Sequence, residues 1–153
     1  MSRRILAVIR SCLVFIMTIT VPAANAASLS DLHWQYRLIV AFTAPGSEHN
    51  QIATHWVTSN RCRLRDRDLL IINIHDSTSE ELTDTGLTLN ASAIASLNTR
   101  RKSPEAGFEM LLIGKDGGVK THSEDTADLN NFIRLIDTMP MRQREAKADK
   151  CPP

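Results

Sequence analysis

Two continuous apolar runs constrain the fold of this chain more than any other feature of its sequence: RLIVAFTA at residues 37–44 and LLIINIH at residues 69–75. Each run contains β-branched residues and ends at polar or turn-forming residues, so each predicts a strand buried on both faces. Ser47 can cap a helix between them that runs to about Arg61 or a little beyond, and its apolar positions at helical spacing are Ile52, Ala53, Trp56 and Val57. A helix that joins two buried strands predicts a right-handed βαβ unit with parallel strands.

The second half of the chain predicts two more strands and two more helices. Residues 76–90 are polar and rich in Ser, Thr, Asp and Gly, so we expect a loop, followed by a short helix that Asn90 caps. FEMLLIG at residues 108–114 predicts a third strand, and GVKTHS at residues 118–123 predicts a weaker fourth one. A last helix, interrupted by Pro140, should bury Leu129, Phe132, Ile133 and Ile136. The order β-α-β-α-β-β-α predicts an α/β fold, a three-layer α/β/α sandwich with a mixed four-stranded sheet.

The stretch LLIGKDGGVK, residues 111–120, resembles a phosphate-binding loop at first sight. A loop of the Walker type needs a Gly-Lys-Ser/Thr sequence followed by a helix. Here Lys115 comes before the glycine pair, Asp116 follows it, and the next segment predicts a strand. The Asp116-Gly117 pair is instead typical of a hairpin turn. The stretch therefore predicts a turn between two strands and gives no argument for a nucleotide site.

The first 26 residues have the pattern of a secretory signal peptide. A basic start, MSRR, precedes an apolar run at residues 12–21, and Ala24-Asn25-Ala26 is a cleavage site of the small-x-small kind. The apolar run is too short to span a bilayer, which needs about 20 residues. We therefore predict a protein exported to the periplasm or outside the cell, cleaved after Ala26 and without a membrane anchor after cleavage.

Length and charge predict one nearly neutral domain after cleavage. Removal of 26 of the 153 residues leaves 127, enough for a single modest core. We assign the domain to residues 27–145 and a charged tail to residues 146–153. The leader holds Arg3, Arg4 and Arg10 and no acidic residue, so the formal net charge of +1 becomes 15 basic against 17 acidic residues. This balance gives no argument for binding nucleic acid or a membrane surface.

Two cysteines remain after cleavage, Cys62 and Cys151. Export predicts an oxidising compartment, where an even number of cysteines is compatible with a disulfide. The alternative is that Cys62 is a buried or half-buried thiol while Cys151 lies in a frayed tail. The sequence leaves both alternatives open.

Two other features favour structural roles. The stretch RCRLRDRD at residues 61–68 follows a predicted helix end, where cations complement the helix dipole, so we expect solvated side chains rather than an anion site. Trp34 and Tyr36 precede the first strand, and we expect them to pack at its entry rather than to form a binding platform.

The predicted element order, with a parallel first pair and a final hairpin, resembles the thioredoxin fold. Four stretches together resemble the domain of unknown function 4174 family: RLIVAFTA, RDRDLLII, FEMLLIGKDGGVKTHSED and LIDTMPMRQRE. The similarity covers about residues 29–145. The resemblance implies a thioredoxin-like fold and an exported protein, and relatives of this domain also occur in extracellular sushi-repeat-containing proteins. It implies no particular activity.

The resemblance also shows which residues are missing. A redox thioredoxin carries two cysteines at the start of its first helix, where the helix N-terminus lowers a thiol pKa. The matching stretch here, PGSEHN at residues 45–50, contains no cysteine. Glu109 stands near the place of the proline that typically precedes the third strand of a thioredoxin. We therefore predict no CxxC redox chemistry, and we assign no catalytic residue.

The same topology brings several polar residues to one edge of the sheet. The carboxyl ends of parallel strands are a frequent ligand site in open α/β sheets. The candidate binding residues at this edge are Ser47, His49, His75, Asp76, Arg100 and Arg101, with Glu109 near them. They predict a site for a partner protein or a small anionic ligand. The alternative is a capping serine surrounded by solvated loop residues.

A binding or interaction module without a cofactor is the function that the sequence favours. One alternative is a peroxide- or disulfide-handling enzyme that uses Cys62. Another is metal handling through His49, His75 and Asp76, since imidazole and carboxylate groups ligate zinc and copper.

Overall fold

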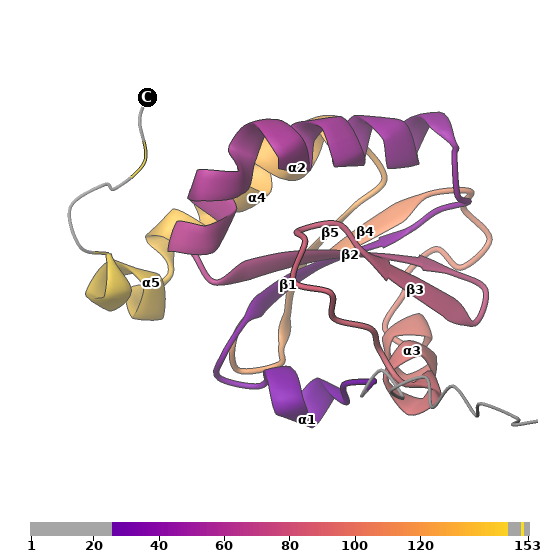
Figure 1. Cartoon of the computed structure of the whole chain (residues 1–153), viewed down its shortest axis with the longest axis horizontal. Helices are drawn as coiled ribbons and strands as arrows, with labels where there is room; N and C mark the ends of the chain where they lie inside the picture. The colour runs from indigo at the N-terminus through magenta and orange to yellow at the C-terminus, as the bar shows by residue number, and fades with distance from the viewer. Residues whose placement is uncertain (1–25, 147–150, 152–153) are drawn as a thin grey trace, which may run out of the picture.

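A single mixed sheet runs through the molecule in the strand order β3-β2-β1-β4-β5 (Figure 1). The computed structural model describes residues 26–146 and Cys151. The strands are β1 (Arg37–Phe42), β2 (Leu69–His75), β3 (Thr78–Glu81), β4 (Glu109–Ile113) and β5 (Val119–Ser123). The helices are α1 (Leu29–Leu32), α2 (Glu48–Asp66), α3 (Ala91–Asn98), α4 (Leu129–Thr138) and α5 (Pro140–Glu145), and a 3₁₀ turn at Thr126–Asp128 precedes α4.

The two ends of the chain fall largely outside this description. The predicted signal peptide, apart from Ala26, and the predicted tail, apart from Ala146 and Cys151, lie outside the described residues. None of the helices in residues 26–146 combines the length and the apolar character that a membrane span requires.

The parallel βαβ unit predicted from the sequence is confirmed. β1 and β2 pair in parallel, from Arg37 opposite Leu69 to Phe42 opposite Ile74. β4 pairs antiparallel with β1, and β5 pairs antiparallel with β4. Helices α2 and α4 cover one face of the sheet, and α1 and α3 cover the other (Figure 1). The chain therefore forms the predicted thioredoxin-like α/β/α sandwich, with a fifth strand added beside β2.

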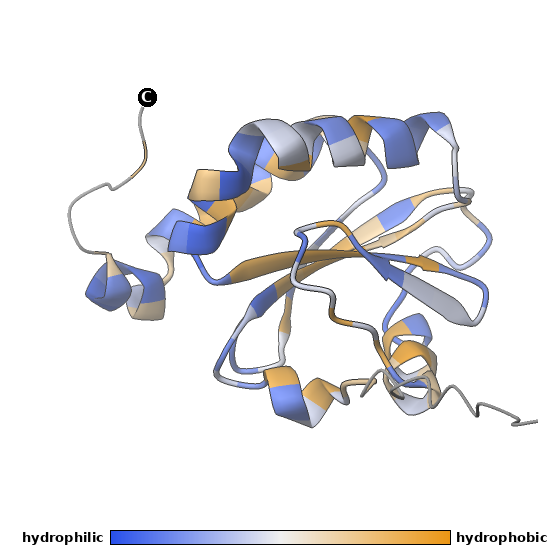
Figure 2. Ribbon diagram, viewed as in Figure 1, coloured by the Kyte–Doolittle hydropathy of each residue, from blue (hydrophilic) through white to orange (hydrophobic). Residues whose placement is uncertain are grey.

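Each face of the sheet has its own hydrophobic core. Along β1, Ile39 and Ala41 pack with α2 and α4, whereas Leu38 and Val40 pack with α1 and α3. Because both faces of the central strands are buried, these strands have continuous apolar sequences. Figure 2 shows the same distribution, with hydrophobic strands between helices that carry hydrophilic residues on their outer sides.

The prediction of a loop over residues 76–90 is wrong in its first part, because this segment contains β3. A turn at Asp76 and Ser77 reverses the chain, and Asp76 adopts a left-handed backbone with φ of 51°. β3 then pairs antiparallel with β2. The strand sequence TSEE is polar because it lies at the sheet edge, with side chains alternating between exposed and half-buried. Without a glycine turn or apolar alternation, the usual sequence signals of a hairpin are absent.

The turn predicted in LLIGKDGGVK is confirmed. Gly117 N donates to Gly114 O at 2.9 Å, and Gly114 N donates to Gly118 O at 3.0 Å, which closes the β4–β5 hairpin. Gly117 has φ of 74°, a conformation that glycine adopts without a steric penalty. The lysine of this stretch, Lys115, has a structural role described below.

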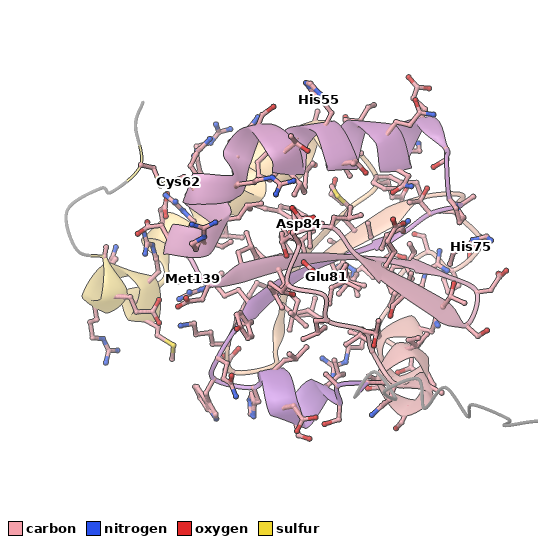
Figure 3. All side chains as sticks on the ribbon, viewed as in Figure 1. His55, Cys62, His75, Glu81, Asp84 and Met139 are labelled. Atoms are coloured by element: carbon pink, nitrogen blue, oxygen red, sulfur yellow. A yellow bond between two sulfur atoms is a disulfide. The ribbon has the colours of Figure 1, made fainter. Side chains whose placement is uncertain are left out.

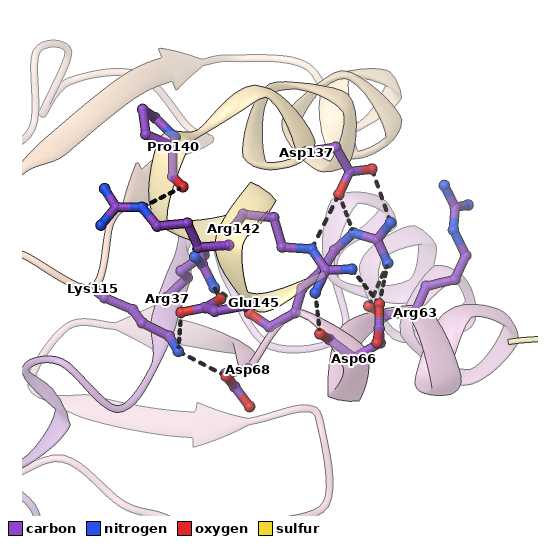
Figure 4. Close-up of polar contacts among 11 residues, drawn as sticks. Arg37, Arg63, Asp66, Asp68, Lys115, Asp137, Pro140, Arg142 and Glu145 are labelled. Carbon is purple, nitrogen blue, oxygen red and sulfur yellow. Dashed lines mark hydrogen bonds and ion pairs between the residues drawn. The ribbon is translucent and has the colours of Figure 1, made fainter. Parts of the chain in front are cut away.

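A network of ion pairs closes the end of the sheet where β1 begins (Figure 4). Arg67 is 6% exposed and donates through Nε and Nη2 to the two carboxylate oxygens of Asp137, at 2.8 Å each. Arg142 donates from Nη1 to Asp66 O at 2.6 Å and also pairs with the Asp66 carboxylate. The prediction that residues 61–68 are solvated is therefore wrong for Arg67, because a distant acidic residue gives it a fixed partner.

The same network extends to the β4–β5 turn. Arg37 is 1% exposed, and its Nη1 donates to Arg67 O at 2.8 Å and lies 3.0 Å from Glu145 Oε2. Lys115 Nζ lies 2.7 Å from Asp68 Oδ2 and 2.8 Å from Glu145 Oε1. These contacts attach α5 to the start of β1, to the end of α2 and to the hairpin (Figure 4).

The network makes stability depend on pH at both extremes. Burial acts to lower the pKa of Lys115, but hydrogen bonds and charges from Asp68 and Glu145 raise it above its ordinary value. A group with a raised pKa stabilises the fold fully below its unfolded-state pKa, about 10.4 for lysine, and this contribution is lost as pH rises through the folded-state pKa. For Glu145, burial acts to raise the pKa, but hydrogen bonds from Lys115 and Arg37 lower it. Its contribution is present above about pH 4.3 and is lost as pH falls through the folded-state pKa.

In the wild type, we expect the free energy of unfolding to decline as pH rises above about 10, and in Lys115→Met this decline should be smaller. Urea denaturation across the pH range measures both. Lys102, which is exposed, provides the matched control, and Lys102→Met should keep the alkaline decline of the wild type. An alkaline decline that is the same in both variants would contradict the role assigned to Lys115.

Candidate functional site

β1 and β2 end at the same edge of the sheet, and the chain between α3 and β4 folds over that edge. A cavity of about 310 Å³ lies there. We call it the carboxyl-end crevice, and the residues that line it include Phe42, Thr43, His75, Asp76, Arg101 and Gly107. The crevice thus contains three of the six predicted binding residues, namely His75, Asp76 and Arg101.

Ser47 and His49 lie at the start of α2, beside the crevice rather than in its lining. Ser47 Oγ accepts a hydrogen bond from Asn50 N at 3.2 Å and lies 2.7 Å from Thr43 Oγ1, so it caps the helix. The His49 ring stacks on Phe108, with the ring centroids 4.1 Å apart. Its Nδ1 is buried without a hydrogen-bond partner among the described residues. Both side chains therefore have structural contacts at the position where a redox thioredoxin carries its thiols.

His75 and Asp76 lie together at the end of β2. His75 Nε2 is 3.3 Å from Asp76 Oδ2, and the Asp76 side chain is 84% exposed. No three His, Cys, Asp or Glu side chains come together as metal ligands within residues 26–146 and Cys151. The structure therefore does not assemble His49, His75 and Asp76 into a metal centre.

Arg101 is held in a fixed position on the wall of the crevice. Its guanidinium carbon lies 4.7 Å from the centroid of the Phe42 ring, a cation–π contact. Nε lies 3.3 Å from Glu109 Oε2, and Nη2 donates to Ser103 O and Ala106 O at 3.2 Å each. Nη1 makes no hydrogen bond to another described residue. One edge of a rigidly held guanidinium is therefore available to a ligand.

Glu109 is the buried residue that organises this region. Its side chain is 1% exposed, and besides Arg101 it accepts hydrogen bonds from Lys102 N at 2.8 Å and Ser103 N at 3.2 Å. His122 Nδ1 lies 3.0 Å from Glu109 Oε1. Burial acts to raise the pKa of Glu109, but the hydrogen bonds from Lys102 N, His122, Ser103 N and Arg101 lower it below its ordinary value. Glu109 is therefore a carboxylate that fixes the chain between α3 and β4.

Sequence reasoning placed Glu109 at this edge but missed His122. In the β4–β5 pairing, His122 lies opposite Leu111, two residues after Glu109 and on the same face of the sheet. The period of two along a predicted hairpin is the signal that could have found this pair.

Arg100 is not at this edge, which corrects its place among the predicted binding residues. Its Nη1 donates to Gly117 O at 2.9 Å, in the β4–β5 turn at the opposite end of the sheet. Arg100 and Arg101 follow the end of α3, where backbone hydrogen bonds to Leu97 O and Asn98 O keep the chain turning. Adjacent side chains on a turning chain point in different directions, so these two arginines reach opposite ends of the sheet.

Cys62 and Cys151 form a disulfide, with their Cα atoms 5.7 Å apart. Cys62 lies on α2 at the opposite end of the molecule from His75 (Figure 3). In this oxidised state Cys62 offers no free thiol, and the bond is remote from the carboxyl-end crevice.

Comparison with known proteins identifies a family. The family model described as Domain of unknown function (DUF4174) matches residues 28–145. No curated protein sequence matches the chain. Similar solved structures include the mitochondrial 2-cys peroxiredoxin of Plasmodium falciparum, with 14% identity, a TM-score of 0.47, and coverage of 81% of this chain and 86% of that one. Another is Prx1a of Plasmodium yoelii modified at its N-terminus, with 18% identity, a TM-score of 0.45, and coverage of 81% and 83%.

Proposed function

This chain belongs to the DUF4174 family, and we propose that it is a binding module that holds an anionic group of its ligand against Arg101 in the carboxyl-end crevice. The observation that carries the proposal is the fixed guanidinium. Phe42, Glu109 and two backbone carbonyls hold Arg101 in place, while Nη1 stays available to a ligand.

A fixed arginine is a good anion receptor for a physical reason. Nη1 carries two N–H donors that carboxylate or phosphate oxygens can accept, and a charge-assisted hydrogen bond of this kind is stronger than a neutral one. Ordering a long side chain on binding normally costs about 0.5–1.5 kcal/mol. Arg101 is already ordered by its contacts in the folded protein, so binding has little of this entropy left to lose.

The crevice also limits the kind of ligand. Its volume of about 310 Å³ accommodates a small anion or one acidic side chain of a partner protein. The exposed carboxylate of Asp76 stands in the lining and disfavours a second negative charge nearby. We therefore favour a ligand group with a single compact anionic end.

Thiol chemistry is not part of this proposal. The start of α2 carries the Ser47 cap, and Cys62 is joined to Cys151 far from the crevice. A binding role needs neither cysteine.

The test is a titration of the mature protein with inorganic phosphate and with acetate, followed by amide and Arg101 Nε–Hε resonances in two-dimensional NMR. We expect saturable shifts at Arg101 Nε–Hε and at the amides of Thr43, Ala44, Gly46, Ser47, Ala106 and Gly107. Arg101→Lys, which keeps the charge but loses Nη1 and the contacts that fix the guanidinium, should weaken binding by about tenfold or more. Urea denaturation of the variant establishes that it folds.

Arg100→Lys is the matched control, because Arg100 lies at the other end of the sheet. It should leave the crevice shifts unchanged. Shifts spread over the whole surface, or crevice shifts that survive in Arg101→Lys, would overturn the proposal.

A further inference from the structure

A second cavity lies at the opposite end of the sheet, between α1, the start of β1 and the β4–β5 turn. We propose that this cavity, of about 280 Å³, binds a small molecule that has an apolar body and one carboxylate, with the carboxylate on Arg100. We call it the turn-end cavity, and the residues that line it include Leu32, His33, Tyr36, Ile113, Lys115 and Arg100.

The turn-end cavity has a mixed lining, in which a small apolar part lies beside polar groups. Leu32 and Ile113 are buried, and Tyr36 is half-buried against the same core. Ligand cavities are usually about 300–1,000 Å³ and mostly apolar, with few polar groups that orient the ligand. The turn-end cavity, at about 280 Å³, is slightly smaller than this range, so it fits a body about as large as one aromatic side chain.

The charge balance of the lining selects an anion. Lys115 is neutralised by Asp68 and Glu145, and Asp116, which also lines the cavity, is paired with Lys120 at 2.6 Å. Arg100 has no acidic partner within the described part of the chain, and its single hydrogen bond there, to Gly117 O, uses only Nη1. The unbalanced positive charge at this cavity therefore belongs to Arg100, and a carboxylate is its complement.

An unusual aromatic residue, Trp34, follows His33, which lines the cavity. Trp34 is 59% exposed and has φ of 65°, a left-handed backbone that is uncommon for a bulky residue. The backbone N–H of Trp34 donates to Lys115 O at 2.7 Å, and its ring stacks on the His33 ring with the centroids 4.8 Å apart. The expectation that Trp34 packs at the entry of β1 is therefore wrong. Because both His33 and Lys115 line the cavity, Trp34 is an exposed aromatic residue attached to its lining, and it can contact the apolar body of a ligand bound there.

Trp34 also supplies the readout of the test, because the chain has only two tryptophans. In a Trp56→Phe background, the fluorescence of Trp34 is followed during titration with 3-phenylpropionate and with its neutral amide, 3-phenylpropionamide. We expect saturable binding of the acid and binding of the amide that is weaker by about tenfold or more. Arg100→Gln should remove this preference for the acid.

Lys102→Gln is the matched control, because it removes an exposed positive charge that does not line the turn-end cavity, and it should keep the preference for the acid. The amide resonances of residues 113–117 provide a second readout that does not depend on fluorescence. Equal binding of acid and amide, a preference that persists in Arg100→Gln, or the absence of shifts at residues 113–117 up to the solubility of the probe would overturn the inference. Since the two arginines are tested separately, failure here leaves the proposal for Arg101 standing.

Discussion

Glu109→Ala is expected to lower the free energy of unfolding by about 3–5 kcal/mol, the range for removing one partner of a buried charged pair. The Glu109 side chain is 1% exposed and accepts from four donors. Alanine would leave the guanidinium of Arg101 and the His122 ring without their carboxylate. It would also leave the N–H groups of Lys102 and Ser103 without acceptors. These donors are part-buried, so each loses a charge-assisted hydrogen bond that water replaces only in part.

Two further variants, Glu109→Gln and Glu105→Ala, separate the charge of Glu109 from general effects of substitution. Urea denaturation at neutral pH measures the free energy of unfolding of all three variants. Glu109→Gln keeps an acceptor oxygen but loses the charge. Its free energy of unfolding should therefore lie between that of the wild type and that of Glu109→Ala. Glu105→Ala removes an exposed acid from the same connecting chain, and it should change stability by less than about 0.5 kcal/mol. Equal losses in Glu109→Ala and Glu105→Ala would refute the organising role of Glu109.

The parts of the fold that could be predicted are those specified by local sequence. The apolar runs of β1 and β2 and the cap at Ser47 each carry their signal within a few residues. The Asp116-Gly117 turn does so too, because only a few residue types adopt its backbone. β3 carries no such signal, since its turn at Asp76 lacks glycine and its polar sequence resembles that of a loop.

The candidate site could be predicted only in part, because its contacts join residues that are distant in sequence. The sheet topology correctly brought His75, Asp76 and Arg101 to one edge. It could not show that Arg100 turns to the other end, since that depends on how the chain leaves α3. Likewise, Arg67 finds Asp137 across 70 residues of sequence. Charge patterns in sequence do not contain such pairings.

The stretches that carry the family resemblance meet in the ion-pair network. RLIVAFTA, RDRDLLII, FEMLLIGKDGGVKTHSED and LIDTMPMRQRE together supply Arg37, Asp66, Arg67, Asp68, Lys115, Asp137, Arg142 and Glu145. Each of these four stretches therefore contributes at least one residue to the contacts that attach α5 to the sheet.

Loss of the disulfide is the other change for which we expect a large effect. The Cys62–Cys151 bond joins residues 89 apart in sequence. On the chain-entropy model, a closed loop of this length contributes about 4–5 kcal/mol by restricting the unfolded chain. We expect the reduced mature protein, and the double variant Cys62→Ser with Cys151→Ser, to be less stable than the oxidised protein by about this amount. Reductant should not affect the double variant, which makes it the control for reduction itself.

The urea dependence of unfolding tests how the disulfide stabilises the fold as well as by how much. A cross-linked unfolded chain exposes less surface, so the oxidised protein should show a smaller m-value than the reduced protein. Equal midpoints in the oxidised and reduced states would mean that the bond does not stabilise the fold. The same samples address the enzyme alternative, because a stabilising bond should leave no free thiol in the oxidised protein. Rapid consumption of peroxide by Cys62 in the reduced wild type, absent from Cys62→Ser, would instead favour a redox role over a purely structural one.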